Sequence, residues 1–222
     1  SSTTEDGTDT DRDAGGGDDP ENAGGDGSGA ATSTRAPGTT EKGSSPMPEV
    51  APALREPMVV MDNGFYRGDV RDGEPHGYGS FYWNNGDVFT GTWKDGRRHG
   101  FGRLEWASGG YYEGEWRNGD RHGPGTIEYA DGSTYEGDWK DDRRDGIGVM
   151  EWPNGDTYEG EWKDGRQHGV GLFVWADGSW YEGRWKDGEP HGAGVMAFAD
   201  GMTYEGRFAS GVPSGGWLTT SN

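Results

Sequence analysis

The chain has 222 residues and a formal net charge of −20, because 40 acidic side chains outnumber 20 lysines and arginines. Residues 1–63 carry 4 basic and 13 acidic side chains and residues 64–222 carry 16 and 27, so both parts repel phosphate and disfavour bulk binding to nucleic acid or anionic lipid. The lack of cysteine excludes disulfides and thiolate metal sites.

Residues 1–57 contain no aromatic residue and consist largely of Gly, Asp, Glu, Ser, Thr and Pro. Such a segment cannot bury enough apolar surface to offset its ordering entropy, which predicts a disordered acidic tail that is dispensable for folding. No signal peptide and no apolar run of membrane-spanning length is found, so we expect a cytoplasmic protein. Because the sequence starts at Ser1 rather than Met, one interpretation is that it is a fragment.

Residues 58–65 hold the apolar run Met58–Met61 before Asn63-Gly64, which predicts a capping strand. A 23-residue block then recurs without insertion, and it is marked by an aromatic residue at Tyr66, Phe89, Tyr112, Tyr135, Tyr158, Tyr181 and Tyr204. Glycine follows two residues later, and in five blocks tryptophan follows four residues later. This period indicates a supersecondary unit stacked on copies of itself, which favours an extended binding surface over a catalytic pocket.

One repeat shows the expected local structure. Tyr158–Trp162 alternates with period two, which predicts a half-buried strand with its glutamates on the other face. Asp164-Gly165 supplies a turn, Gly169 opens a second strand, and Asp177-Gly178 turns the chain back. Each unit is therefore a β-hairpin.

Two sets of glycines need an explanation. The glycine between the two aromatics of each first strand leaves a slot for a neighbouring ring. A second set is expected to serve backbone geometry after the loop; it comprises Gly77, Gly100, Gly123, Gly146, Gly169 and Gly192.

Together these patterns predict an all-β protein, a single elongated antiparallel β-meander solenoid of β-hairpin repeats with a disordered N-terminal tail. Six repeats span residues 66–203. Residues 204–222 are interpreted as a partial seventh repeat and a C-terminal cap, because the unit that begins at Tyr204 loses its second glycine pair.

These residues resemble the MORN (membrane occupation and recognition nexus) repeat, whose pattern is Tyr-x-Gly-x-Trp-x-x-Gly-x-x-x-Gly-x-Gly. The match is closest over Tyr112–Gly125, Tyr158–Gly171 and Tyr181–Gly194, and it covers about Tyr66 to Phe208. Members of that family form β-hairpin solenoids with an aromatic-lined groove. They occur in junctional and cytoskeletal scaffolds, in axonemal spoke heads, and as regulatory segments of lipid kinases and a SET-domain methyltransferase. The resemblance implies binding or scaffolding without choosing the partner.

Four positions depart from the pattern. Val70 replaces the first tryptophan and Phe89 replaces the second tyrosine. Repeat four has Asp142 in place of glycine and Asp145 in place of histidine. Because Asp tolerates a left-handed turn, we expect the fold to survive.

No nucleophile–base–orienter set is visible, so we expect no enzyme, no catalytic residue and no cofactor. All five histidines precede a glycine at one repeat position: His76, His99, His122, His168 and His191. Equivalent atoms in adjacent repeats lie roughly 10 Å apart, too far to share a zinc ion at about 2.1 Å. We therefore expect no metal site, and histidines bonded to loop carbonyls.

The aromatic residues of the second strands are the candidate partner groove. They are Trp83, Trp106, Tyr129, Trp152, Trp175 and Phe198. A single-layer sheet cannot bury a whole face, so we expect the ribbon to coil on its aromatics and to leave this row partly open. A helix or extended peptide of a partner protein is the expected occupant. The family resemblance implies that this partner is a cytoskeletal, axonemal or membrane-junction protein and that the chain associates with the cytoskeleton or a cilium.

The hairpin loops offer an alternative. One edge carries acidic residues without neighbouring cations, namely Asp87, Asp131, Asp156, Asp177 and Asp200. The other edge mixes signs and holds a basic patch of Lys94, Arg97, Arg98, Arg117 and Arg121. The patch is a candidate site for a lipid headgroup or an acidic peptide, and a lipid ligand would make the protein a peripheral membrane module that binds anionic phospholipid headgroups. The overall negative charge favours the competing interpretation, a solvated edge with short-range charge balance. A third alternative is a regulatory segment of a larger enzyme.

Each end of the solenoid exposes an unpaired strand edge. The short strand around Val59 protects only the N-terminal edge. Self-association as a homodimer by edge pairing is therefore predicted at the C-terminal edge, near Phe208 and Trp217.

Overall fold

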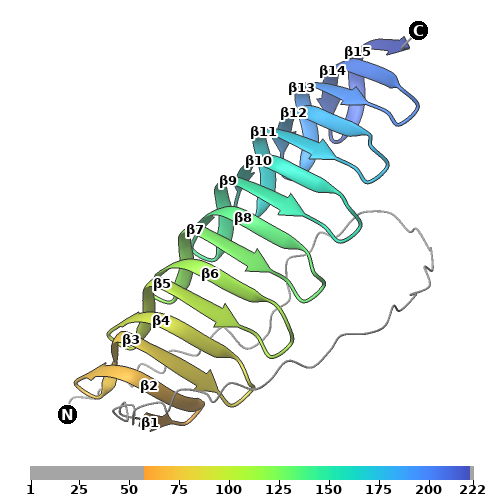
Figure 1. The fold of residues 1–222 in the computed structure, drawn as a ribbon. Coiled ribbons are helices and arrows are strands. Elements are labelled where there is room, and N and C mark those ends of the chain that lie inside the picture. Colours follow the sequence, from red (N-terminus) through yellow and green to blue (C-terminus); the bar gives the residue numbers. More distant parts are fainter. Residues whose placement is uncertain (1–57, 221–222) are drawn as a thin grey trace, which may run out of the picture. The chain divides into compact units, whose positions relative to one another are not determined.

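The structure, a computed structural model, describes residues 58–220 (Figure 1). These residues contain no helix that could span a membrane, and they form one antiparallel sheet of 15 strands in sequential order. The strands are β1 (Met58–Met61), β2 (Gly64–Arg71), β3 (Glu74–Trp83), β4 (Val88–Lys94), β5 (Arg97–Glu105), β6 (Tyr111–Arg117), β7 (Asp120–Glu128), β8 (Thr134–Lys140), β9 (Arg143–Glu151), β10 (Thr157–Lys163), β11 (Arg166–Val174), β12 (Trp180–Lys186), β13 (Glu189–Ala197), β14 (Met202–Ala209) and β15 (Val212–Thr220). The predicted all-β meander is confirmed, whereas the tail predicted for residues 1–57 lies outside the described residues.

Two-residue turns join each even-numbered strand to the following odd-numbered one. In the turn between β4 and β5, Asp95 and Gly96 both have positive φ, at 51° and 76°. This sign pattern belongs to the type I′ turn, whose twist matches that of the flanking strands. In the turn of repeat four, Asp141 and Asp142 adopt φ of 49° and 66°, so aspartate does take the left-handed conformation there.

The second strand of each repeat starts directly after this turn, three residues before the start predicted from Gly169 in the case of β11. The strand contains a bulge that strict alternation does not reveal. Gly91 pairs with Gly102 and Trp93 with Arg98, so β5 holds two more residues than β4 between these pairs. Gly100 lies within the bulge at φ 71°, which confirms a backbone role for the second glycine set.

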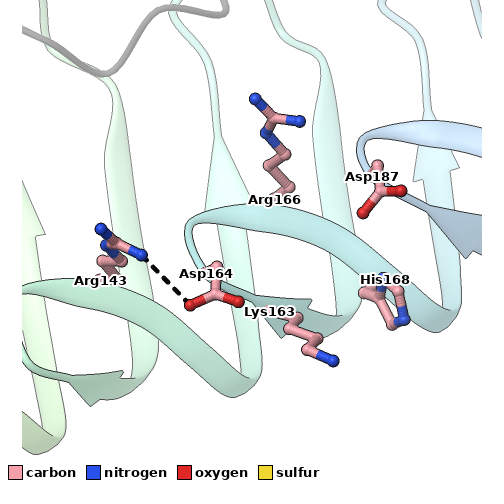
Figure 2. Close-up of a pocket in the computed structure, with 6 residues that line it drawn as sticks. All are labelled: Arg143, Lys163, Asp164, Arg166, His168 and Asp187. Carbon is pink, nitrogen blue, oxygen red and sulfur yellow. Dashed lines mark hydrogen bonds and ion pairs between the residues drawn. The ribbon is translucent and has the colours of Figure 1, made fainter.

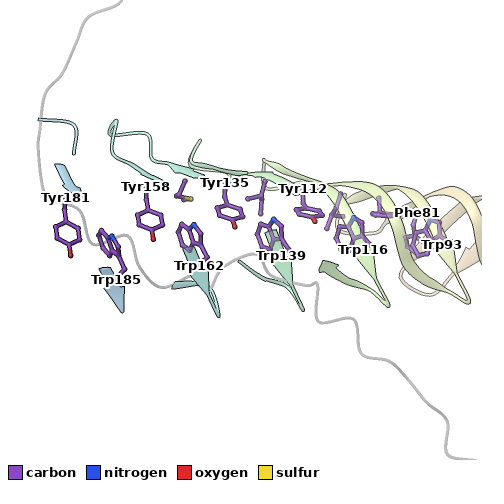
Figure 3. Packing of buried hydrophobic residues seen from close by; sticks show 14 of the residues in the cluster. Phe81, Trp93, Tyr112, Trp116, Tyr135, Trp139, Tyr158, Trp162, Tyr181 and Trp185 are labelled. Carbon is purple, nitrogen blue, oxygen red and sulfur yellow. The ribbon is translucent and has the colours of Figure 1, made fainter. Parts of the chain in front are cut away.

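The core is a continuous row of rings, here called the aromatic ladder. Its members are the seven marker aromatics, the five tryptophans Trp93, Trp116, Trp139, Trp162 and Trp185, and Phe208. Figure 3 shows tyrosines and tryptophans in two facing rows. Tyr135 meets Trp139 of its own repeat at 5.2 Å and Trp162 of the next at 5.3 Å, both edge to face. The sheet therefore packs its aromatic face on itself, as expected.

The first glycine set makes room for this ladder. A β-carbon on Gly137 would lie 2.5 Å from Cα of Gly148, which faces it on β9. A β-carbon on Gly148 would lie 2.5 Å from the ring of Tyr135. The slot predicted from the glycines therefore exists, and the ring that fills it is the tyrosine two residues earlier on the same strand.

The C-terminal unit corrects one prediction. It does not lose the glycine opposite its first strand, because Gly216 pairs with Gly206 one residue earlier than the repeat period requires. Only one extra residue is accommodated there, since Arg207 pairs with Gly215 and Phe208 with Pro213. This shift turns Trp217 to lie opposite Glu205.

Candidate binding surface

The ladder tryptophans have their polar atoms satisfied inside the sheet. Trp139 Nε1 donates to the Gly125 carbonyl at 3.2 Å, and the four other ladder tryptophans make the equivalent bond at 3.1–3.2 Å. The Tyr135 hydroxyl donates to the Asp138 carbonyl at 3.0 Å, and burial raises the pKa of Tyr135 well above its usual range. The ladder is thus a closed core with no donor left for a ligand.

The candidate groove residues form a second row on the same side of the sheet, here called the aromatic rim: Trp83, Trp106, Tyr129, Trp152, Trp175 and Phe198. Each is half-buried and packs against the core. Trp175 meets Phe173 at 4.7 Å, and Trp152 meets the same ring at 5.4 Å. The rim is therefore partly covered and partly open, as the sequence predicted for a face that the ribbon cannot fully bury.

The backbone holds every rim residue in a fixed loop. Trp152 N donates to the Asp156 carbonyl at 2.9 Å, and Gly155 N donates to the Trp152 carbonyl at 2.9 Å. The same pair of bonds recurs at all six rim positions. These loops present their rings with little conformational freedom, which lowers the entropy cost of binding.

The rim indoles differ from the ladder indoles in one respect. None of the indole N–H groups of Trp83, Trp106, Trp152 and Trp175 donates a hydrogen bond to a residue that the structure describes. Buried or interfacial tryptophans usually find a partner for this group. The rim can thus offer apolar ring surface together with hydrogen-bond donors.

The carboxylates of the acidic loop edge build these loops. Asp87 Oδ1 accepts a hydrogen bond from Ala107 N in the next repeat at 2.8 Å. Asp131 accepts bonds from the hydroxyl and the N–H of Ser133, which hold the pKa of Asp131 below its usual range. Asp177 and Ser179 repeat this arrangement. The carboxylates of this edge therefore stabilise the loops by accepting hydrogen bonds from them.

The structure divides the predicted basic patch. Arg98 and Arg121 are half-buried, and their guanidinium groups lie over the ladder rings of Trp116 and Trp139 at 4.3 and 4.4 Å. Arg121 Nε also bonds Asp142 Oδ1 at 3.0 Å. These two arginines thus cover the ladder, and their charges are used within the fold.

The other three cations of the patch lie exposed at the hairpin edge. Lys94 stands opposite Arg97, and Arg117 stands opposite Asp120. Burial, together with neighbouring Asp142, raises the pKa of Asp120. This edge therefore carries charges of both signs, and its basic part is the pair Lys94 and Arg97.

A polar hollow of about 440 Å³ lies further along the same edge (Figure 2). Arg143, Lys163, Asp164, Arg166, His168 and Asp187 line it. Arg143 Nη1 and Asp164 Oδ1 are 3.3 Å apart and largely exposed, so this ion pair contributes little to stability. The sequence analysis did not single out this hollow, because its residues come from three consecutive repeats.

The position before the second glycine set contacts the turn of the next repeat in two repeats. His76 Nδ1 accepts a hydrogen bond from Asp95 N in the next turn at 3.4 Å, so the expected partner, a loop carbonyl, is wrong for this residue. Asp145 takes the same role, since its carboxylate accepts from Asp164 N at 3.3 Å. No group of three or more metal-ligating side chains is present among residues 58–220.

The structure does not bring the two predicted self-association residues together. Phe208 is buried at 3% exposure and closes the ladder against Tyr181. Trp217 is 78% exposed on β15, the last described strand. Val212 and Leu218 are exposed on the same strand.

Sequence analysis missed an apolar row on the opposite side of the sheet. Tyr78, Phe101, Ile147 and Val170 are exposed, and each stands between the two glycines of a Gly-x-Gly triplet. The sequence could have revealed this row, because each of these residues is one position away from the inward-facing row that contains Gly171 and Phe173. An alternating strand must point them the other way.

Comparison with known proteins identifies the repeat. The MORN repeat model matches six consecutive stretches, residues 66–88, 89–111, 112–134, 135–157, 158–180 and 181–203. No curated protein matches the chain. Among solved structures, the TCP domain of Drosophila melanogaster SAS-4 (dCPAP), in complex with a proline-rich motif of Ana2 (dSTIL), is 16% identical, with coverage of 72% of this chain and 82% of that chain and a TM-score of 0.38. A mutant TCP10 domain of Danio rerio CPAP is 14% identical, with coverage of 74% and 99% and a TM-score of 0.18.

Proposed function

Because the chain belongs to the MORN repeat family, whose repeats interact with proteins and membranes, we propose that it is a non-catalytic scaffold that binds a partner protein. The aromatic rim is the binding site, and a helix or an extended segment of the partner lies along it. The proposal extends to a cytoplasmic protein associated with the cytoskeleton or a cilium.

The observation that carries this proposal is the exposure and hydrogen bonding of the rim indoles, compared with those of the ladder. The ladder tryptophans are 3–6% exposed and bond glycine carbonyls. The rim tryptophans are half-buried, and their N–H groups have no acceptor among residues 58–220. Tryptophan is a frequent anchor of protein interfaces, where an acceptor on the partner satisfies its N–H.

Affinity capture from the cells that express the protein tests this assignment. The double variant Trp106→Ala/Trp152→Ala should lose the proteins that the unchanged chain retains, while the circular dichroism of the sheet persists. Trp106→Phe/Trp152→Phe keeps the rings but removes both N–H donors, so an intermediate loss is expected. Trp217→Ala is the matched control, because it removes an exposed tryptophan away from the rim. Equal capture by all four chains would refute the proposal.

A peripheral membrane module is the second candidate, supported by the cations at the hairpin edge. Lys94 and Arg97 are exposed there, and Lys163 and Arg166 line the hollow of Figure 2. Aspartates alternate with these cations, and the chain carries a net charge of −20, which opposes attraction to an anionic surface. Flotation with vesicles that contain a phosphoinositide tests it; binding that disappears with salt and with Lys94→Glu/Arg97→Glu supports this candidate.

The third candidate, a regulatory segment of a larger enzyme, depends on the sequence of the complete gene. An open reading frame that continues into a catalytic domain would favour it, and one that encodes only the repeats and the acidic segment would remove it.

A further inference from the structure

The large hydrophobic residues that are exposed along the middle of the sheet all occupy one repeat position. Among the described residues between Arg71 and Val212, the exposed large hydrophobic side chains are Tyr78 (61%), Phe101 (59%), Ile147 (58%) and Val170 (54%). Pro124 and Ala193 are the exposed residues at the same position of the other two repeats. We call these six residues the outer stripe.

Strand register sets the outer stripe in line with a second set of residues. Phe101 of β5 pairs with Glu115 of β6, Pro124 with Asp138, and Ile147 of β9 with Glu161 of β10. Adjacent strands are about 4.8 Å apart, so apolar and acidic side chains alternate along this line roughly every 5 Å. The alternation ends at the C-terminal side, where Val170 pairs with Arg184.

At the bulge, side-chain carboxylates bond the backbone of the stripe residues. Ile147 N donates to Asp138 Oδ2 at 3.1 Å, and Val170 N donates to Glu161 Oε1 at 2.9 Å. A side-chain carboxylate thus replaces the backbone acceptor that the bulge removes. Pro124 has no N–H to donate, and Glu115 is exposed on the neighbouring strand β6.

Further carboxylates surround the stripe in its central repeats. Glu128, Glu136, Glu151 and Glu159 are exposed on strands β7 to β10. Each follows a buried residue of its own strand, so its side chain points to the outer side of the sheet. Arg103 is bonded to Glu105 at 2.8 Å and to Glu113 at 3.0 Å, so its charge is already matched. An apolar line between carboxylates complements a ligand with an apolar line between cations.

We propose that the outer stripe from Phe101 to Val170 is a second docking surface, and that it binds a basic amphipathic helix of a partner protein. Each repeat advances the sheet by about 10 Å, or two strand spacings. Seven residues of an α-helix advance by about 10.5 Å. A helix with one apolar residue per heptad and lysine or arginine beside it therefore presents one anchor to each repeat.

Other occupants fit less well. A second copy of this face would bring like charges together, and an anionic membrane would be repelled for the same reason. The segment of residues 1–57 is acidic itself, with 12 carboxylates against 4 cations. This surface is separate from the aromatic rim, so the inference stands whether or not the rim holds the partner of the proposed function.

Fluorescence polarisation with synthetic peptides tests the docking surface on the full chain. The probe is a labelled peptide of three heptads, with leucine once per heptad on a lysine-rich face; a serine-for-leucine version has the same charge. We expect the leucine peptide to bind at least tenfold more tightly than the serine peptide, and to weaken as salt rises. Equal binding of the two peptides would overturn the proposal.

Two variants locate the site independently. Phe101→Ser/Ile147→Ser/Val170→Ser should weaken the leucine peptide at least tenfold, and Glu115→Lys/Glu136→Lys/Glu159→Lys should do the same without changing the apolar side chains. Trp106→Ala/Trp152→Ala and Trp217→Ser are the controls and should bind normally. The proposal would be contradicted if the serine or the lysine variant keeps its sheet signal in circular dichroism and binds the leucine peptide unchanged. It would also be contradicted if Trp106→Ala/Trp152→Ala loses binding.

Discussion

The aromatic ladder and the aromatic rim contain the same residue types, yet the fold uses them differently. Trp139 of the ladder is 3% exposed, bonds Gly125 through its indole and lies under Arg121. Trp152 of the rim contacts Phe173 on one side and is open on the other. Both repeat every 23 residues. Periodicity therefore identifies residues that share a role, whereas burial and hydrogen bonding decide what that role is.

The largest expected effect separates these two rows directly. Trp139→Ala removes ring contacts with Tyr112 and Tyr135, so we expect it to destabilise the sheet by about 3–5 kcal/mol. Trp152→Ala should cost only about 1–2 kcal/mol, because its ring is half-buried. Thermal melts followed by circular dichroism measure both, and about 2–4 °C is expected per kcal/mol. Equal shifts for the two variants would remove the distinction.

The second expected effect concerns the glycines that admit the ladder. Gly148→Ala would place a β-carbon 2.5 Å from the ring of Tyr135, which is packed against Trp139 and Trp162. We expect a loss of about 1–3 kcal/mol from overpacking. The control is Ala193→Gly, which lies in the outer stripe and alters no ladder contact. A Gly148→Ala chain with an unchanged denaturation midpoint would show that the slot is not tight.

A smaller effect is expected at the ladder hydroxyls. Tyr135→Phe removes the bond from the hydroxyl to the Asp138 carbonyl and leaves the ring in place, so about 1 kcal/mol should be lost. The chain already contains this change at Phe89, which is fully buried. Chemical denaturation of Tyr135→Phe provides the measurement, and a loss as large as that of Trp139→Ala would mean that the hydroxyl, and not the ring, holds the ladder together.

The smallest expected effect concerns the charge of Asp120 beside Asp142 at the hairpin edge. Burial and Asp142 raise the pKa of Asp120 in the folded chain, so this group favours folding when protonated, and its contribution is lost as pH rises through the folded pKa. Asp120→Asn should therefore raise the melting temperature at pH 7 by about 1–2 °C, discounted for exposure. The gain should vanish below about pH 4, where Asp120 is protonated in both states. A gain that persists at low pH would assign it to another cause.

Much of the fold follows from the sequence, because alternation and period are local signals. The Tyr-x-Gly-x-Trp strands face inward as predicted, and the Asp-Gly turns adopt the expected backbone. The bulge was not predictable from alternation, since it inserts two residues on one side of the odd-numbered strands from β3 to β13 while the other side stays regular, as β5 shows. That insertion lengthens each of these second strands, so β11 starts at Arg166 rather than at Gly169.

The candidate site was predictable only in part. The second-strand aromatics were named from their shared face, and they do form a half-open row. Interactions between repeats were not predictable from the sequence, because they join residues 14 to 24 positions apart. Arg98, for example, bonds the Gly119 carbonyl and covers Trp116. The prediction of a basic patch therefore counted a cation whose charge is used within the fold.

The most direct test of the account is the exchange of tryptophan indole protons, followed by nuclear magnetic resonance on chain labelled with nitrogen-15. The account predicts that the indole protons of the five ladder tryptophans exchange slowly, because they are buried and bonded to glycine carbonyls. Those of Trp83, Trp106, Trp152 and Trp175 should exchange rapidly and become protected when a partner is added. Equal protection of the two groups in the free chain would contradict the claim that the rim is held open for binding.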